Sequence, residues 1–69
     1  GSKVKVSGGN INVRSSPKIN PFNRIGKQKT GALGTVIDGS VMADGYTWWK
    51  VDFDSGVDGW IADRYLTPL

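Results

Sequence analysis

Residues 44–66 read DGYTWWKVDFDSGVDGWIADRYL, and this stretch decides the fold of the 69-residue chain. It contains all three tryptophans and both tyrosines. Asp44-Gly45 separates two strand-like runs, and such a pair favours the type I′ turn of a hairpin, in which both central residues have positive φ. Residues 46–53 are the longest expected strand. Asp54-Ser55-Gly56 then predicts a second turn, and residues 57–62 are expected to return as its partner strand.

Two smaller signals complete the C-terminal half of the chain. Gly59 lies inside the return strand, which predicts a bulge or the close approach of another backbone. Residues 63–65 are expected to form a single helical turn before Leu66. This half of the chain is therefore expected to be a three-stranded meander with a short helical end.

The N-terminal half is expected to contain short strands and one long loop. Alternation of polar and apolar residues predicts strands at 3–6 and 11–14. Runs rich in β-branched residues predict two further strands at 35–37 and 40–43, with a turn at Asp38-Gly39 between them. The polar segment 15–30 has no regular period, and we expect it to be a loop whose Phe22 and Ile25 cover one end of the fold.

Five or six short strands without a helix-length period predict an all-β fold. In a chain this short, closure into a small barrel is favoured because it removes exposed strand edges. We expect one domain over residues 3–69, preceded by Gly1-Ser2, which resembles a cloning scar. No apolar run reaches transmembrane length, and we expect a monomeric module of a longer protein.

Composition argues against catalysis and against metal or cofactor binding. The chain has no cysteine and no histidine, so it lacks the commonest nucleophile–base pairs and metal ligands. Asp52, Asp54 and Asp58 do not match a calcium-loop spacing, and no glutamate is present to complete such a loop. We therefore expect a non-catalytic protein without a cofactor.

Charge is unevenly distributed along the chain. Residues 1–30 contain seven Lys or Arg side chains and no acid, a sum of +7, whereas residues 31–69 contain two Lys or Arg and six Asp, a sum of −4. The N-terminal half is thus suited to an anionic partner. A solvated basic surface is the simpler explanation, and nucleic acid is the least favoured partner.

Alternation along strand 46–53 separates its two tryptophans onto opposite faces. Trp49 shares a face with the apolar Val51 and Phe53, so we expect Trp49 in the core. Trp48 shares the other face with Lys50, so we expect Trp48 at the surface beside Tyr46. The alternative is that the long loop covers Trp48 and that this residue merely packs.

Five motifs together resemble the bacterial SH3-like (SH3b) domain family. Asn12-Val13-Arg14-Ser15-Ser16-Pro17 is similar to the family's N-(V/L)-R-S-x-P opening, and Ile25-Gly26 and Gly34-Thr35-Val36 resemble the next two steps. Residues 45–51, GYTWWKV, resemble the G-x-W-x-K-V strand, and residues 56–66, GVDGWIADRYL, resemble the closing G-x-x-G-W-V-x-x-x-Y-L. The chain departs from the pattern in its longer loop after Pro17 and in its doubled tryptophan.

The resemblance implies an SH3-like barrel without catalytic activity, which tethers a larger cell-envelope or peptidoglycan-acting protein to peptidoglycan or its peptides. It also implies an extracellular or cell-envelope location. The alternative is a structural adaptor that docks onto a partner or neighbouring domain. A shallow aromatic groove is the typical peptide site of such barrels, and the candidate ligand-binding residues are Tyr46, Trp48, Trp60, Tyr65 and Arg14.

Two of these candidates have a plain structural alternative. If Ile61 is in the core, alternation leaves Trp60 partly exposed, but Trp60 is also suited to covering one end of the barrel. Arg14 is suited to binding a carboxylate through two hydrogen bonds, but an internal salt bridge with one of the aspartates is the favoured alternative.

Overall fold

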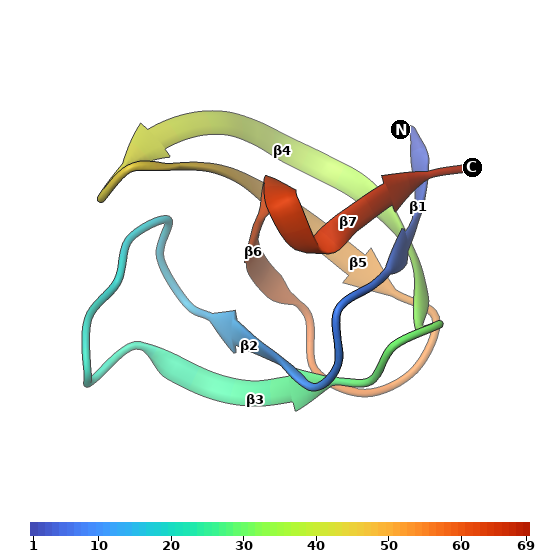
Figure 1. Ribbon diagram of the computed structural model, residues 1–69, viewed down its shortest axis with the longest axis horizontal. Coiled ribbons are helices and arrows are strands. Elements are labelled where there is room, and N and C mark those ends of the chain that lie inside the picture. The colour runs from blue at the N-terminus through green and yellow to red at the C-terminus, as the bar shows by residue number, and fades with distance from the viewer.

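In a computed structural model, which describes residues 1–69, the chain forms one curled antiparallel sheet of seven strands (Figure 1). The strands lie side by side in the order β3-β2-β6-β5-β4-β1-β7. The only helical segment is a single 3-10 turn, η1, so no helix has the length and apolar character needed to cross a membrane. The elements are β1 (Lys3–Val6), β2 (Ile11–Arg14), β3 (Arg24–Gln28), β4 (Leu33–Ala43), β5 (Tyr46–Phe53), β6 (Gly59–Ala62), η1 (Asp63–Tyr65) and β7 (Leu66–Pro68).

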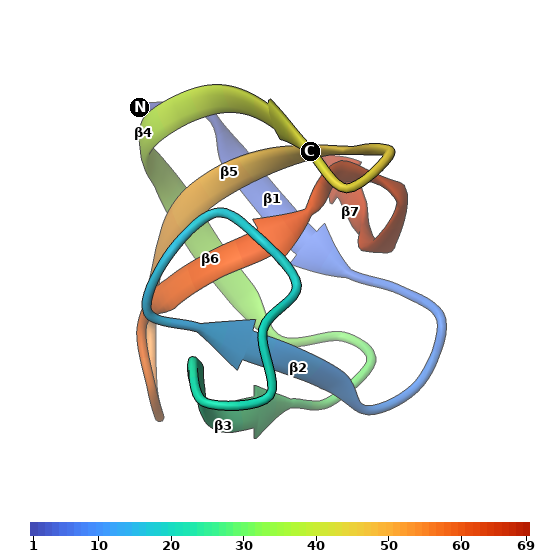
Figure 2. The same cartoon turned by 90° about the vertical axis from the view of Figure 1, so that its left-hand side faces the viewer.

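The sheet is strongly bent but does not close into a barrel. β3 and β7 are its two edge strands, and no ladder joins them. The predicted all-β class is correct, whereas the predicted loss of strand edges by closure does not occur. Figures 1 and 2 show the sheet wrapping around an interior, and the two terminal strands, β1 and β7, pair with each other.

The two hairpins predicted in residues 44–66 are present. Asp44 and Gly45 both have positive φ, at 54° and 78°, as the turn between β4 and β5 requires. β5 has the predicted bounds, and η1 is the predicted helical turn. The return strand β6 is shorter than predicted because it begins only at Gly59.

Gly59 permits a close approach of β2 to β6, as its position predicted. A Cβ atom at Gly59 would lie 2.5 Å from the backbone oxygen of Arg14 and 2.8 Å from Val13 Cγ1. Only glycine leaves room for this contact, since real Cβ atoms do not approach other heavy atoms so closely. The glycine thereby fixes where the β2–β3 hairpin meets the rest of the sheet.

Three predictions for the middle of the chain were wrong. The expected strands at 35–37 and 40–43 are one continuous strand, β4, because the Asp38-Gly39 signal produces register shifts that bend the strand without ending it. The expected loop over 15–30 contains an edge strand, β3. Phe22 and Ile25 do not cover an end of the fold, since Phe22 is 94% exposed and Ile25 is 48% exposed.

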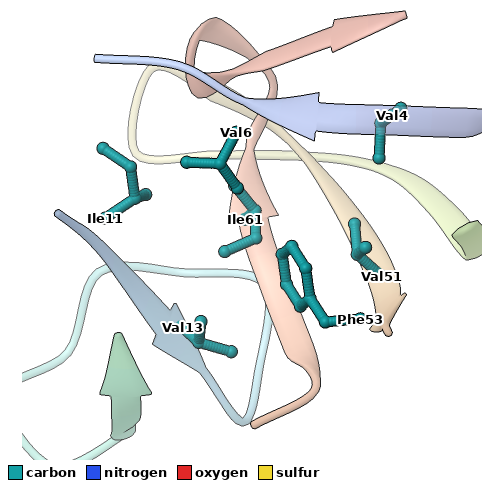
Figure 3. Close-up of a cluster of buried hydrophobic side chains, with 7 residues drawn as sticks. All are labelled: Val4, Val6, Ile11, Val13, Val51, Phe53 and Ile61. Atoms are coloured by element: carbon teal, nitrogen blue, oxygen red, sulfur yellow. The ribbon is translucent and has the colours of Figure 1, made fainter. Parts of the chain in front are cut away.

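The core lies inside the curl and is built from short aliphatic side chains with one aromatic ring. The alternating strands β1, β2, β5 and β6 each point their apolar face inward, as the period of two requires. Figure 3 shows the seven buried side chains converging from these four strands. They are Val4, Val6, Ile11, Val13, Val51, Phe53 and Ile61.

A second, smaller apolar cluster lies on the other face of β5 and β6. It consists of Trp48, Trp60 and Ala62, with Ala43, Tyr46 and Tyr65 packed against it. Trp48 stands opposite Ala62 in the β5–β6 ladder, whereas Trp49 stands opposite the core residue Ile61. Part of this sheet is thus apolar on both faces, and the second cluster provides the floor of the candidate site.

Candidate functional site

A groove of about 250 Å³ lies beside the second cluster. It is lined by aromatic side chains, amide side chains, small residues and one cation. We call it the tyrosine groove, after the two tyrosines in its wall. Its lining residues are Gly8, Asn10, Ile11, Asn12, Arg14, Ile19, Tyr46, Trp48, Ala62 and Tyr65.

Separate elements bring the groove residues together. Tyr46 and Trp48 come from β5, with their rings in edge contact at 5.8 Å between centroids. Tyr65 comes from η1, and Asn12 and Arg14 come from the face of β2 that points away from the core. The hairpin turn after β4 and the helical turn after β6 therefore place two tyrosines that are distant in sequence on one wall.

The segment 15–23, which we call the β2–β3 loop, stands in front of β6 (Figure 2). Its Ile19 lines the tyrosine groove. The Ile19 backbone N–H donates a hydrogen bond of 2.8 Å to the carboxylate of Asp44, in the turn between β4 and β5. This bond ties the loop to the hairpin that carries Tyr46.

Asn23 organises the β2–β3 loop. Its side chain is 6% exposed, and its amide nitrogen donates to the oxygen of Lys18 at 2.7 Å and to both oxygens of Ser16 at 3.0 and 3.3 Å. Its backbone oxygen accepts from the N–H of Ser15. A buried amide with these partners holds the loop in one shape, because each bond that is lost leaves a polar group unsatisfied.

Arg14 holds the same loop from β2. Its Nη1 donates to the backbone oxygen of Asn20 at 3.0 Å and to Oδ1 of Asn23 at 2.9 Å. The sequence-based alternative of a salt bridge with an aspartate is wrong, since both acceptors are uncharged. Asn20 and Asn23, rather than the acidic residues, had the spacing to reach back to β2.

The predicted exposures of the two neighbouring tryptophans were wrong. Trp48 is 3% exposed, and its Nε1 donates to the backbone oxygen of Ala43 at 3.0 Å. Trp49 is only partly buried, and its Nε1 donates to Asp63 at 3.0 Å. Alternation assigned the two residues to opposite faces correctly, but it did not indicate that a second cluster covers the Trp48 face.

Trp60 is also more buried than predicted, with 9% of its surface exposed. It packs in the second cluster with Trp48 and Ala62, while its neighbour Ile61 is fully buried in the core. Trp60 does not line the tyrosine groove. Of the five candidate residues, Tyr46, Trp48, Tyr65 and Arg14 are brought together at the groove, and Trp60 belongs to the second cluster with Trp48.

Sequence reasoning missed several residues of the groove. Ile19, Asn10 and Asn12 line it, but none belongs to an aromatic or charged pattern. Arg64 was also missed. Its guanidinium carbon lies 5.9 Å from the ring centroid of Tyr46 and 5.4 Å from that of Tyr65, so it contacts both tyrosines. Nothing in the sequence of residues 59–66, GWIADRYL, indicated that Arg64 would contact Tyr46.

A second hollow of about 200 Å³ shares no residue with the tyrosine groove. It is lined by Ser2, Val4, Val36, Trp49, Asp63, Leu66 and Pro68, and it lies close to the paired termini. Trp49, which was predicted to be in the core, forms part of its wall.

The tyrosine groove contains one formal charge, that of Arg14, and no acidic residue among its lining side chains. Several aspartates are engaged elsewhere: Asp44 accepts from Ile19 N–H, Asp58 from Phe53 N–H and Asp63 from Trp49 Nε1. No group of three or more potential metal ligands comes together. The groove offers aromatic surface, amide hydrogen bonds and a positive charge, which is the chemistry of binding.

Comparison with protein-family models, with curated proteins and with solved structures found no match to this chain.

Proposed function

We propose that this chain is a bacterial SH3-like domain that acts as a non-catalytic binding module. It tethers a larger cell-envelope or peptidoglycan-acting protein to peptidoglycan or its peptides, outside the cell or in the envelope. The five motifs that resemble the family support this proposal, and so does the curled antiparallel sheet that carries them.

The tyrosine groove is the observation that carries the proposal. Tyr46 and Tyr65 present flat, amphipathic rings that bind at low cost in conformational entropy. Asn10 and Asn12 carry amide side chains, which donate and accept hydrogen bonds as a peptide backbone does. An open groove with this lining suits an extended peptide better than a small molecule, which prefers an enclosed apolar pocket.

Co-sedimentation with purified peptidoglycan sacculi tests the proposed function. The wild-type protein is expected in the pellet, and Tyr46→Ala and Tyr65→Ala are expected to remain largely in the supernatant because each removes one of the two tyrosine rings from the groove wall. Circular dichroism of each variant establishes that the sheet is retained.

Phe22→Ala is the matched control for the sacculus experiment. Phe22 is an aromatic residue, 94% exposed, that does not line the groove. This variant is expected to pellet like the wild type. Recovery of the wild-type protein in the supernatant at low salt, or equal loss of binding in Phe22→Ala and the tyrosine variants, would contradict the proposal.

The second hollow favours a second candidate function, that of an adaptor docking onto a neighbouring domain. It is more apolar than the groove, and Trp49 and Val36 in its wall are partly exposed. Several exposed apolar side chains, including Ile37 and Met42, lie on β4. In that case a neighbouring domain raises the unfolding midpoint of this one, and Trp49→Ser removes the increase while sacculus binding is unchanged.

A further inference from the structure

Arg14 is held in place by hydrogen bonds from one nitrogen of its guanidinium, while the other two nitrogens have no partner in the protein. It is partly buried at the end of β2, and it is the only cation that lines the tyrosine groove. Its Nη1 is occupied by two acceptors from the β2–β3 loop, the oxygens of Asn20 and Asn23. These bonds hold the guanidinium in place without neutralising it, because both acceptors are uncharged.

The other two nitrogens of the guanidinium make no hydrogen bond within the protein and are not fully buried. Nε and Nη2 of Arg14 have no acceptor in the protein, and the chain contains no buried side-chain nitrogen without a partner. In the planar guanidinium, Nε and Nη2 form one edge with two parallel N–H groups. This edge matches the two oxygens of a carboxylate.

The surroundings of Arg14 add to its preference for an anion. No acidic side chain lines the groove, so no carboxylate of the lining competes for the Arg14 guanidinium. A phosphate dianion is matched less well, because no second cation lines the groove to share its charge. The carboxylate of a peptide fits both the single charge and the two-pronged edge.

We propose that Arg14 binds a free carboxylate of the peptide that occupies the tyrosine groove. The module therefore selects carboxylate-bearing peptides, such as a peptidoglycan stem peptide, over neutral ones, such as a glycine bridge. The inference rests on the proposed function, since it requires a peptide in this groove. It adds the chemical class of that peptide and the residue that recognises it.

The decisive experiment compares two peptides on the unmodified protein. One is the stem tetrapeptide alanyl-γ-glutamyl-lysyl-alanine with free carboxylates, and the other is the same peptide with every carboxylate converted to the amide. We expect the amide to bind about tenfold to hundredfold more weakly in a calorimetric titration, since hydrogen bonds to charged groups are the strong ones. A neutral pentaglycine peptide is expected to behave like the amide.

Two variants assign the discrimination to Arg14. Arg14→Lys keeps the charge and removes the two-pronged edge, so the ratio between the two peptides is expected to fall towards one. Lys3→Gln removes one unit of charge at an exposed position on β1 that does not line the groove, and it is expected to preserve the ratio.

The outcomes distinguish the inference from the proposed function. Equal affinity of the unmodified protein for the acid and the amide overturns the inference alone. Binding of sacculi without binding of either peptide also overturns it and leaves the tethering function standing. Failure to bind sacculi and both peptides overturns the proposed function and the inference together.

Discussion

At the scale of single residues, Trp48 is the side chain on which both the second cluster and the tyrosine groove depend. It is 3% exposed, its Nε1 is bonded to Ala43, and its ring contacts Tyr46 and lies in the groove floor. Trp48→Ala is expected to cost about 3–5 kcal/mol, as truncation of a large buried aromatic side chain does. A single core of this size supplies about 3–5 kcal/mol in total, so circular dichroism is expected to show an unfolded protein.

Trp49→Ala is the matched control, since it removes the same atoms from the next position in the strand. Trp49 is partly exposed and its side-chain bond goes to an exposed aspartate, Asp63. Its loss is expected to fall at the lower end of the usual range of about 0.5–3 kcal/mol, measured by urea unfolding. A folded Trp48→Ala variant together with an unfolded Trp49→Ala variant would contradict the assignment of Trp48 as the buried tryptophan of the pair and Trp49 as the partly exposed one.

The same pair shows what strand alternation can predict. Alternation gives the face of a side chain reliably, and it separated Trp48 from Trp49 as the β5–β6 ladder does. Burial depends in addition on what covers that face. Here the cover includes Tyr65, in η1, and Trp60 and Ala62, in β6, which are distant from Trp48 in sequence. Pattern within β5 carries no information about them.

At the scale of elements, the β2–β3 loop is ordered by a hydrogen-bonded amide in place of an apolar core. Asn23→Ala removes three donated bonds and one of the two acceptors for Arg14. The expected loss is about 1–3 kcal/mol, because buried partners are left unsatisfied. Hydrogen exchange of backbone amides in 15–23, including that of Ile19, is expected to quicken while exchange in β5 changes little.

Asn20→Ala is the control for the loop prediction. The Asn20 side chain accepts a single exposed bond from the backbone of Phe22, and its backbone oxygen remains available to Arg14. Slow exchange in the loop is expected to persist in this variant. Unchanged exchange in Asn23→Ala would show that the contact of Ile19 with Asp44, or packing against the groove, suffices to order the loop.

The elements differ in how far sequence predicts them, and the reason is the kind of residue that fixes each one. β5 and its turn at Asp44-Gly45 follow from local signals, an apolar period of two and a pair that accepts positive φ. β3 is an edge strand, and its only buried residue is the last one, Gln28. The Gln28 side-chain amide donates to the backbone oxygens of Ser55 and Val57. A strand held by such distant polar partners has no apolar period to detect.

The candidate site follows the same rule. Tyr46, Tyr65 and Arg14 were predictable because aromatic and guanidinium groups are rare and suited to binding. Ile19 and Asn12 were not, because they reach the groove only through the path of the loop and the register of β2 with β3. Residue type alone therefore identified the aromatic and cationic residues of the groove, whereas Ile19 and Asn12 could be identified only from the tertiary structure.

At the scale of the whole molecule, the β2–β3 hairpin is joined to the other five strands at a narrow contact. The ladder between β2 and β6 consists of one residue pair, Arg14 with Trp60, beside Gly59. The Ile11 and Val13 side chains reach across this contact into the shared core. The position of the hairpin, and with it the position of Arg14 in the groove, therefore depends on how closely β2 approaches Gly59.

Gly59→Ala tests this dependence. The added carbon would lie 2.5 Å from the Arg14 backbone oxygen, and backbone cannot yield as the end of a flexible side chain can. Overpacking of a well-packed site costs about 1–3 kcal/mol, which is a large part of the roughly 3–5 kcal/mol available to so small a core. Urea unfolding followed by tryptophan fluorescence is expected to show a lower midpoint, with the three tryptophans retained as reporters.

Lys5→Ala on β1 is the control for Gly59→Ala, since Lys5 is exposed and its change is expected to stay within about 0.5 kcal/mol. The informative comparison is between stability and binding. A displaced hairpin carries Arg14 away from Tyr46 and Tyr65, so any folded Gly59→Ala protein is expected to bind sacculi less well than Lys5→Ala. Full stability and full binding in Gly59→Ala would mean that the hairpin adjusts its position freely. In that case the close contact at Gly59 would not be what positions Arg14 in the groove.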